Sequence, residues 1–390
     1  MNVLSAHILV VDDMPDNRNI LIRRLQRLGY SRLSEAEDGI AALAQIQAGD
    51  VDLVLLDVMM PRMNGVEVLQ TLKSEGRLEA TSVIMISASS EVETVVSCLE
   101  LGAEDYLPKP FNASILRARI GSVLEKKFLR TEVRRQLERL EAEMASARLQ
   151  QLAMVPNDFP PSGGPLDLHA VMRPALEVGG DLYDFFPIAE DIFCVAIGDV
   201  SGKGVPAALF MARTRSLLRA GALQHQAIAG KPPSAPDLAT LLNEELCKNN
   251  DNCLFVTLLV GFLDLRTGTF DFVNAGHPPP LLISANGAQE VLGDINLPIG
   301  VQEENVFTGN RIALAADEAL VLITDGLSDM EDPGQSMYST PRLMVDLAEI
   351  PGAGAEAIVD HLVTRVFAHA GDTPQFDDVT VMALRVRPVS

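Results

Sequence analysis

The chain has 390 residues, enough for two or three domains, and its 47% hydrophobic and 22% charged content is typical of a globular protein. A formal net charge of −22 argues against nucleic-acid binding and suits carboxylate clusters that bind divalent cations. No apolar run is long enough to span a membrane. The four cysteines form no CxxC pair and the polar N-terminus is not a signal peptide, so we expect a cytoplasmic protein.

Residues 1–122 alternate apolar runs with amphipathic helical patterns. The runs lie at 7–11, 51–60, 82–88 and 106–107, and the helical patterns at 17–28 and 65–74. Alternating strands and helices predict an α/β domain with a doubly wound parallel sheet. Ligands of such sheets bind beyond the carboxyl ends of the strands, so the residues that follow the runs are the first candidates for a site.

Residues 123–155 contain neither Gly nor Pro and continue a helical pattern out of the first domain. Val133, Leu137, Leu140 and Met144 are spaced by four, three and four, which is a heptad seam bordered by charged residues. We expect a helical coiled-coil linker that makes the chain a homodimer. The alternative is a single solvated helix packed on its own domain.

Residues 156–390 change to short strands with hairpin spacing. Apolar runs lie at 193–197, 255–264, 269–274, 320–323 and 379–386, and helical patterns at 206–220 and 237–249. Prolines and glycines at the start of this segment end the preceding helix. The pattern predicts an α+β domain with a β-sandwich flanked by helices.

Polar residues follow the apolar runs of the first domain. Asp12 and Asp13 follow the first run, Asp57 follows the residues 51–56 of the second, and Ser87 and Lys109 end the strands expected from the later ones. Carboxylates gathered at one sheet edge need a counter-ion, and Mg²⁺ with its oxygen ligands is the natural one. A carboxylate nucleophile, a metal, a hydroxyl and an ammonium are what phosphoryl transfer to an aspartate requires. Any one of these carboxylates alone is more often a helix cap.

Taken together, these motifs resemble the response-regulator receiver family over residues 6–122. The segments that carry the resemblance are Asp12-Asp13, Asp57-Val-Met-Met-Pro61, Gly65, Ser87-Ala88 and Lys109-Pro110-Phe111. The resemblance implies a flavodoxin-like (CheY-like) fold, Asp57 as phosphoacceptor and a cognate histidine kinase as partner. It implies four Mg²⁺ ligands, which are Asp12, Asp13, Asp57 and the backbone carbonyl of Met59. It also implies that Ser87 and Tyr106 are the switch pair, that Lys109 contacts the phosphoryl group, and that the Lys109–Pro110 peptide is often cis.

Isolated aspartates beside glycines recur in the second domain. They lie in segments 179–181, 198–204, 324–326 and 376–380. Asp199 and Asp325 each follow an apolar run, and glycine lets the backbone turn tightly and approach a metal. Carboxylates without His or Cys indicate a hard metal such as Mg²⁺ or Mn²⁺, and two such ions can bind a phosphate ester and activate a water. One Asp-Gly alone is more often a turn than a metal site.

The ordered segments of residues 147–387 resemble the SpoIIE/RsbU-like branch of the type 2C (PPM-type) metal-dependent serine/threonine phosphatases. Segments 147–156, 179–184, 198–208, 274–279, 297–300 and 377–381 carry the resemblance. It implies two Mn²⁺ or Mg²⁺ ions held by Asp181, Asp199, Asp325, Asp377 and the carbonyl of Val200. We expect a supporting role for Gly180, Gly326 and Asp378. The resemblance also implies a phosphorylated STAS-domain substrate, an anti-sigma-factor antagonist in a partner-switching pathway.

Several alternatives stay open at this point. His277 is a candidate general acid, although a structural role in its proline-rich loop is the simpler interpretation. For Asp184 and Lys203 the ordinary interpretations are a helix cap and a solvated lysine. The combined expectation is a response regulator whose phosphorylation controls a phosphatase. The alternative is a non-enzymatic sigma-factor adaptor of RssB type, which has no need to hold four mutually repelling acids together.

Overall fold

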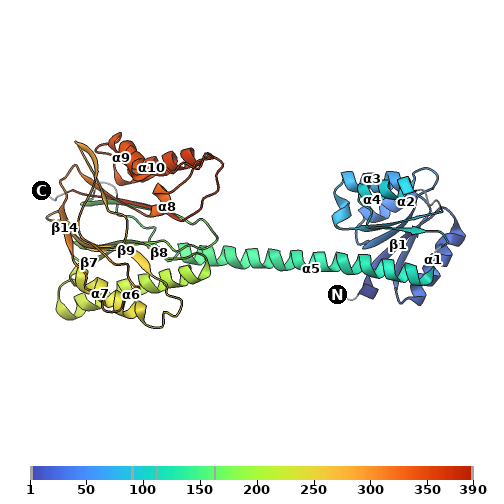
Figure 1. Ribbon diagram of the computed structural model, residues 1–390, viewed down its shortest axis with the longest axis horizontal. Helices are drawn as coiled ribbons and strands as arrows, with labels where there is room; N and C mark the ends of the chain where they lie inside the picture. Colours follow the sequence, from blue (N-terminus) through green and yellow to red (C-terminus); the bar gives the residue numbers. More distant parts are fainter. Residues whose placement is uncertain (1–2, 89–91, 111, 162–163, 388–390) are drawn as a thin grey trace. The chain divides into compact units, whose positions relative to one another are not determined.

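The computed structural model describes residues 3–88, 92–110, 112–161 and 164–387 (Figure 1). The chain forms two compact units, residues 1–140 and 141–390. Phe111 of the Lys-Pro-Phe motif lies outside the described residues. Within the described ranges, no helix is both long and apolar enough to cross a membrane.

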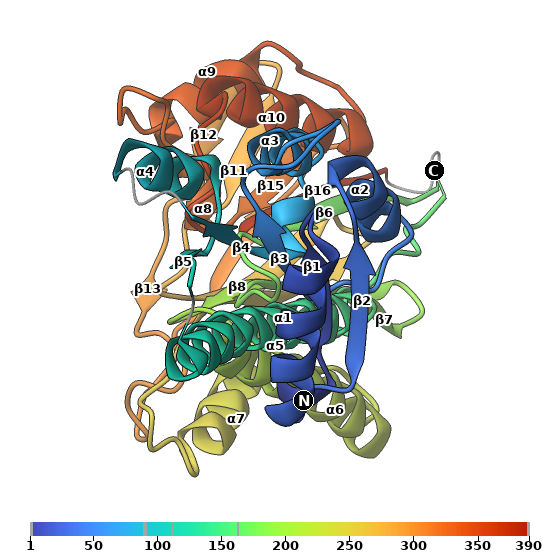
Figure 2. The same cartoon turned by 90° about the vertical axis from the view of Figure 1, so that its right-hand side faces the viewer.

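The first unit contains one parallel sheet of five strands in the order β2-β1-β3-β4-β5, which lie side by side in Figure 2. The strands are β1 (His7–Val11), β2 (Arg32–Ala36), β3 (Leu53–Asp57), β4 (Ser82–Ser87) and β5 (Asp105–Pro108). The helices are α1 (Pro15–Arg27), α2 (Gly39–Gln47), α3 (Gly65–Ser74), α4 (Val92–Leu101) and α5 (Ala113–Leu152). This topology confirms the predicted doubly wound parallel sheet.

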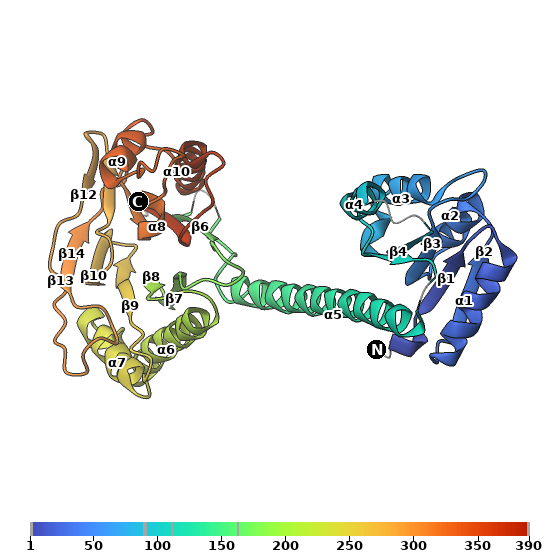
Figure 3. The same ribbon diagram turned by 45° about the vertical axis from the view of Figure 1, so that its right-hand side comes forward.

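Helices cover both faces of this sheet (Figure 3). On β1, Leu9 and Val11 belong to the core beneath α2, α3 and α4, whereas Ile8 and Val10 belong to the core beneath α1 and α5. Successive side chains of a strand point to opposite faces, so a strand covered on both sides is apolar at every position. Strand β2 escaped prediction because it lies at the sheet edge and only its last residue, Ala36, is buried.

Helix α5 begins in the first unit, and the division between the units falls within it. Its first turns are held by the sheet, where Leu116 and Ile120 are fully buried. Farther along, the seam residues Val133, Leu137 and Leu140 each expose more than half of their surface. This part of the helix is not packed on its own domain, so the homodimer remains the prediction for the seam.

The second unit contains two antiparallel-rich sheets. One has the order β13-β10-β9-β8-β7, with β14 also paired to β10, and the other has the order β12-β11-β15-β16-β6. The strands are β6 (Leu166–Arg173), β7 (Leu182–Ala189), β8 (Ile192–Val200), β9 (Val256–Asp264), β10 (Thr269–Ala275), β11 (Leu281–Ser284), β12 (Gly287–Glu290), β13 (Ile295–Asn296), β14 (Asn310–Ala313), β15 (Ala319–Ile323) and β16 (Val379–Val386). The helices are α6 (Val205–Ala229), α7 (Ala235–Cys247), α8 (Asp325–Ser328), α9 (Thr340–Ala348) and α10 (Ala355–Ala370).

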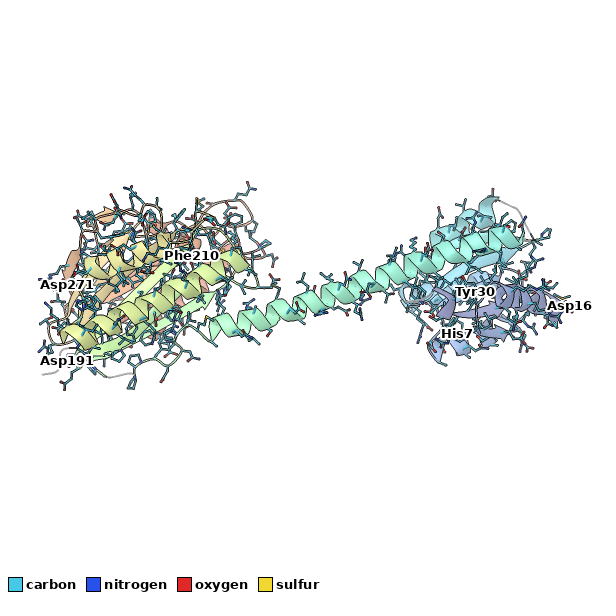
Figure 4. All side chains as sticks on the ribbon, turned by 90° about the horizontal axis from the view of Figure 1, so that it is seen from below. His7, Asp16, Tyr30, Asp191, Phe210 and Asp271 are labelled. Carbon is cyan, nitrogen blue, oxygen red and sulfur yellow. The ribbon has the colours of Figure 1, made fainter. Side chains whose placement is uncertain are left out.

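The two sheets pack face to face through an apolar layer, and helices cover both outer faces (Figure 1). On β8, Val195 and Ile197 belong to the layer between the sheets, whereas Cys194 and Ala196 belong to the core beneath α6 and α7. Phe210 of α6 packs in that outer core (Figure 4). This architecture confirms the predicted β-sandwich flanked by helices. Helix α6 extends beyond the predicted 206–220, and α9 and α10 were not predicted.

Candidate functional sites

The first candidate site lies at the carboxyl ends of β1 and β3. Asp12 and Asp13 follow β1, Asp57 ends β3, and one ligand oxygen from each lies within 4.8 Å of the others. The strands are parallel neighbours, so their ends reach the same edge of the sheet. Asp12 and Asp57 are buried and Asp13 is half-buried. Three carboxylates so close together fit a hard divalent cation such as Mg²⁺, which prefers oxygen ligands.

Lys109 neutralises part of this cluster. Its Nζ donates hydrogen bonds to Asp12 Oδ2 at 2.7 Å and to Asp57 Oδ2 at 2.8 Å. Burial raises the pKa of Asp57, although the hydrogen bond from Lys109 opposes this. Burial alone would lower the pKa of Lys109, but its bonds to the two carboxylates raise it overall. The ammonium therefore stays charged beside the candidate phosphoacceptor.

The other predicted receiver residues surround this edge. Ser87 ends β4, where Ile86 pairs with Asp57, and Tyr106 lies on the neighbouring strand β5. Met59 follows β3 by two residues and exposes its side chain. The Lys109–Pro110 peptide is cis.

Two contacts at this edge were not predicted from the sequence. The Asn17 side chain donates to Asp12 Oδ1 at 3.0 Å and so orients that carboxylate. A side chain at Gly65 would place its Cβ 2.1 Å from the Asp57 carbonyl oxygen. Only glycine lets α3 begin this close to Asp57, the candidate phosphoacceptor.

The second candidate site gathers aspartates from both sheets of the sandwich. Asp181 immediately precedes β7 and Asp199 lies near the end of β8, whereas Asp325 follows β15 and Asp377 precedes β16. Among the described residues, no three acidic, His or Cys side chains in this unit meet the 4.8 Å limit that the first site meets. Without an ion, these aspartates are therefore spaced more widely than the three carboxylates of the first site.

The electrostatics of these aspartates also fit cations. Burial, together with Asp199 and Asp378 nearby, raises the pKa of Asp181 well above its usual range. Burial and the charges of Asp325 and Asp377 raise the pKa of Asp199 to about 7. Burial and the negative charge of Asp377 also raise the pKa of Asp325. Acids held together at this cost fit Mn²⁺ or Mg²⁺, the hard ions expected of an all-oxygen donor set.

Asp181 is fixed by two threonines on the opposite sheet. Its Oδ2 accepts hydrogen bonds from Thr324 Oγ1 at 2.8 Å and Thr380 Oγ1 at 2.5 Å. Both threonines are buried, and each stands close in sequence to another candidate ligand. Their position in the Thr-Asp-Gly and Asp-Asp-Val-Thr segments was visible in the sequence, but their role was not predicted.

Asp378 holds the backbone of the loop that carries Asp181. Its Oδ2 accepts from Gly180 N at 2.6 Å and its Oδ1 from Ala175 N at 2.8 Å. A Cβ at Gly179 would lie 2.0 Å from Asp378 Oδ2, and a Cβ at Gly326 would lie 2.0 Å from its carbonyl oxygen. Glycine is therefore required for this close approach, and Asp378 acts as a positioning residue.

Gly180 adjoins the predicted backbone ligand. A Cβ at Gly180 would lie 2.8 Å from the carbonyl oxygen of Val200, at the end of β8. This oxygen therefore reaches the loop that carries Asp181. Strands β7 and β8 are neighbours in one sheet, so the Val200 carbonyl lies beside the start of the strand that Asp181 precedes.

The ordinary interpretations of two charged residues are wrong. Asp184 is not a helix cap, because it lies fully buried within β7, where Arg219 donates two hydrogen bonds of 2.6 Å to its carboxylate. Lys203 is not merely solvated, because its Nζ donates to the Phe376 carbonyl at 2.6 Å and lies 3.1 Å from Asp377 Oδ2. It also lies 3.7 Å from the centroid of the Phe376 ring.

His277 has a structural environment. Its Nδ1 lies 3.0 Å from Thr257 Oγ1, and its backbone N–H donates to Asn274 Oδ1 at 2.8 Å. Burial lowers the pKa of this imidazole to about 3. His277 is therefore neutral near pH 7, which favours the structural role over that of a general acid.

Gln151, in the last turn of α5, reaches the loop of Asp181. The side chain is buried and pairs twice with the backbone of Gly179, donating to the carbonyl at 2.6 Å and accepting from the N–H at 3.0 Å. No sequence pattern predicts this contact, because the two residues belong to different elements. It joins the end of the helix to a loop that carries a candidate ligand.

Comparison with known proteins matches both units. Residues 190–387 match the family model of stage II sporulation protein E (SpoIIE), and residues 8–121 match that of the response regulator receiver domain. Protein IcfG of Synechocystis is 30% identical over 239 residues, which are 56% of this chain and 37% of IcfG. The chain thus spans little more than a third of that relative.

Two further proteins match one unit each. Chemotaxis protein CheY-3 of Vibrio cholerae is 34% identical over 122 residues, which are 31% of this chain and 94% of CheY-3. The SiaA-PP2C domain of Pseudomonas aeruginosa has a TM-score of 0.56 at 20% identity, and the match covers 64% of this chain and 98% of that domain. At this identity the likeness concerns the fold alone.

The SpoIIE match takes in half of the chain and contains Asp199, Asp325 and Asp377. The receiver match contains Asp12, Asp57 and the other receiver positions described above. Both resemblances drawn from the sequence are thereby confirmed. The chain belongs to the SpoIIE family, with a PP2C-type protein phosphatase domain fused to a response-regulator receiver domain.

Proposed function

We propose that this protein is a response regulator in which phosphorylation of Asp57 controls a metal-dependent serine/threonine phosphatase. We place the receiver at 1–122, the linker at 123–155 and the phosphatase at 156–390. The observation that carries the proposal is the support given to Asp181. Two threonines from the opposite sheet fix its buried carboxylate, and Asp378 and Gln151 fix its loop. A non-enzymatic adaptor would gain nothing from a buried carboxylate fixed beside other carboxylates, because these groups repel one another.

In the receiver, the Asp57 carboxylate would attack the phosphorus of the donor and keep the phosphoryl group as an acyl phosphate. Asp12, Asp13, Asp57 and the Met59 carbonyl would hold Mg²⁺, which when bound supplies charge neutralisation of the phosphoryl oxygens. Lys109, already hydrogen-bonded to Asp57, would then pair with the negative charge of the phosphoryl group. Ser87, at the end of the adjacent strand, would donate to one of its oxygens.

In the phosphatase, Asp181, Asp199, Asp325, Asp377 and the Val200 carbonyl would hold two Mn²⁺ or Mg²⁺ ions. When bound, such ions supply an activated water and charge stabilisation for hydrolysis of a phosphate ester. Lys203 neutralises Asp377 and ties the loop after β8 to the loop before β16. The threonines and Asp378 keep the ligands in place, which is the usual task of residues behind a metal site.

The proposed partners follow from the two resemblances. A histidine kinase would supply the phosphoryl group to the receiver. The substrate would be a phosphorylated STAS-domain anti-sigma-factor antagonist, so that dephosphorylation changes transcription without DNA contact. Both would meet the protein in the cytoplasm.

The enzymatic proposal predicts metal-dependent hydrolysis. The full chain with Mn²⁺ or Mg²⁺ should release phosphate from a generic phosphate ester and from phosphoserine on a STAS-domain protein. Chelation with EDTA should stop both reactions, and added Mn²⁺ should restore them, because the aspartates alone carry no activated water. Phosphate release measured by colorimetry is sufficient. A folded chain that is inert on both substrates with either ion would favour the sigma-factor adaptor.

Helix α5 is the proposed route of control. It ends at Leu152, one residue after Gln151, which holds Gly179 two residues before Asp181. A change in the rotation or register of this helix would therefore act on a loop of the site. A coiled coil through Val133, Leu137 and Leu140 would make that register depend on dimer formation.

The coupling predicts a specific defect when the seam carries charge. Leu137→Glu with Leu140→Glu should place like charges between the helices, weaken dimers and abolish the response of the phosphatase to a phosphodonor, while both domains stay folded. Light scattering measures the dimer, and phosphatase rates with and without phosphodonor measure the response. Ala142→Glu with Ala145→Glu adds the same charge off the seam and should change neither. A double seam variant that responds like wild type would show that the domains communicate without the helix.

A further inference from the structure

A cavity of about 350 Å³ opens beside Asp325 and Asp377. Beyond these two candidate ligands it is lined by two acids, Asp329 and Glu331, and by apolar side chains that include Met330, Met337 and Phe376. We call it the 329–337 groove. Its volume lies at the small end of ligand pockets, about 300–1,000 Å³, and it is continuous with the candidate active site.

Two large apolar side chains of the groove face solvent. Phe376 is 83% exposed and Met337 is 56% exposed. Large apolar side chains that gather beside a cavity, rather than singly, mark a binding surface. Phe376 is also the residue before Asp377, so a chain that contacts its ring lies next to the reacting phosphate.

The wall of the groove is built before any ligand arrives. Glu331 and Met337 pair as an isolated antiparallel bridge. Asp332 Oδ1 closes the turn between them by accepting from Gly334 N at 2.8 Å and Ser336 N at 2.9 Å. The next residue, Tyr338, is buried and donates its N–H to the Met330 carbonyl at 2.9 Å. A preformed wall has little conformational entropy left to lose on binding.

The charge of the groove is acidic once the candidate ligands are set aside. Lys203 pairs with Asp377, and Asp325 belongs to the metal site. The residues that line the groove include no Lys, Arg or His, and the base beside it is Lys203, whose ammonium lies 3.7 Å from the centroid of the Phe376 ring. Two acids beside methionines and a phenylalanine complement a chain segment that carries both basic and apolar side chains.

We propose that the 329–337 groove binds the residues that flank the phosphorylated side chain of the substrate. It selects a segment with a Lys or Arg and an apolar residue next to the phosphoserine or phosphothreonine. The inference rests on the proposed phosphatase function and adds the substrate class to it. Glu331 is then a specificity-determining residue, because it meets the flanking base and lies outside the set of candidate metal ligands.

The test compares two phosphoserine peptides with the full chain and Mn²⁺. One carries Leu and Arg around the phosphoserine and the other carries Leu and Glu, and p-nitrophenyl phosphate serves as a substrate that has no flanking residues. We expect wild type to favour the Arg peptide in kcat/KM by about tenfold, the scale of a well-placed charge pair. Glu331→Lys should abolish or reverse this preference, and the p-nitrophenyl phosphate rate of each protein shows how much of the basal reaction it retains. Glu304→Lys, an exposed charge reversal elsewhere, should keep the preference.

Fluorescence anisotropy with labelled forms of the same peptides separates the groove from the chemistry. An Arg preference in binding that Glu331→Lys removes supports the groove even if no substrate is hydrolysed, in which case the phosphatase proposal fails alone. Equal binding and equal turnover of the two peptides by wild type would overturn the groove. Retention of the Arg preference by Glu331→Lys would also overturn the groove. Met337→Ala should weaken the binding of both peptides, since it removes the apolar contact that they share.

Discussion

Asp199→Asn is expected to lower the phosphatase rate by ~10³-fold, which is about 4 kcal/mol of transition-state stabilisation. The reason is that Asp199 lies near the end of β8 among the other aspartates and would contribute to holding the metals. An amide of the same shape keeps the packing and removes the charge. Steady-state kinetics with saturating Mn²⁺ measure the loss, and calorimetric titration with Mn²⁺ should show weaker metal binding.

A stability measurement separates this loss from misfolding. The folded pKa of Asp199 is about 7, against a reference value of 3.8. Ionising this group therefore costs the metal-free fold stability, and the cost grows as pH rises from about 4 through 7. Without metal at pH 8, Asp199→Asn should be at least as stable as wild type, and the difference should fade toward pH 4. A variant that is inactive and also less stable at pH 8 would contradict this role for Asp199.

Asp57→Ala is expected to abolish acyl-phosphate formation. With Mg²⁺ and a small phosphodonor such as acetyl phosphate, wild type should take up one alkali-labile phosphoryl group, and the variant none, because the nucleophilic carboxylate is gone. Labelling with radioactive phosphodonor, or mass spectrometry of the intact chain, measures this. The phosphatase rate of the variant should then no longer respond to phosphodonor.

Asp16→Ala is the matched control for this variant. Asp16 is an exposed aspartate in the first turn of α1, and its loss should leave labelling and response intact. Undiminished labelling of Asp57→Ala would remove Asp57 as the phosphoacceptor. Normal labelling of wild type without any change in phosphatase rate would instead remove the coupling and leave the receiver chemistry standing.

The amino-acid sequence by itself predicted both domain folds and identified most of the candidate ligands. This was possible because the information is local. A strand covered on both faces is an unbroken apolar run, as at 53–56, and a residue at its end, here Asp57, lies at the sheet edge whatever the rest of the chain does. Aspartate beside glycine at such an end is visible in a few letters, as at Asp325-Gly326.

Some elements were not predicted. For one of them the local pattern is weak, and for another the pattern is clear but was not recognised. Strand β2 is polar because it lies at the sheet edge, so no apolar run marks it. Helix α10, by contrast, has buried residues at helical spacing, among them Ile358, Leu362 and Val366. Its pattern was present in the sequence and could have been found.

Only the tertiary structure decided which residues support the site. Thr324 and Thr380 bind Asp181 although 143 and 199 residues separate them from it, and Gln151 meets Gly179 from another element. Asp184 is a buried partner of Arg219 because strand register turns it toward α6. Local periodicity determines whether a residue belongs to a helix or a strand. Its partner across the fold depends on how the two sheets and their helices pack, and one sequence does not state this.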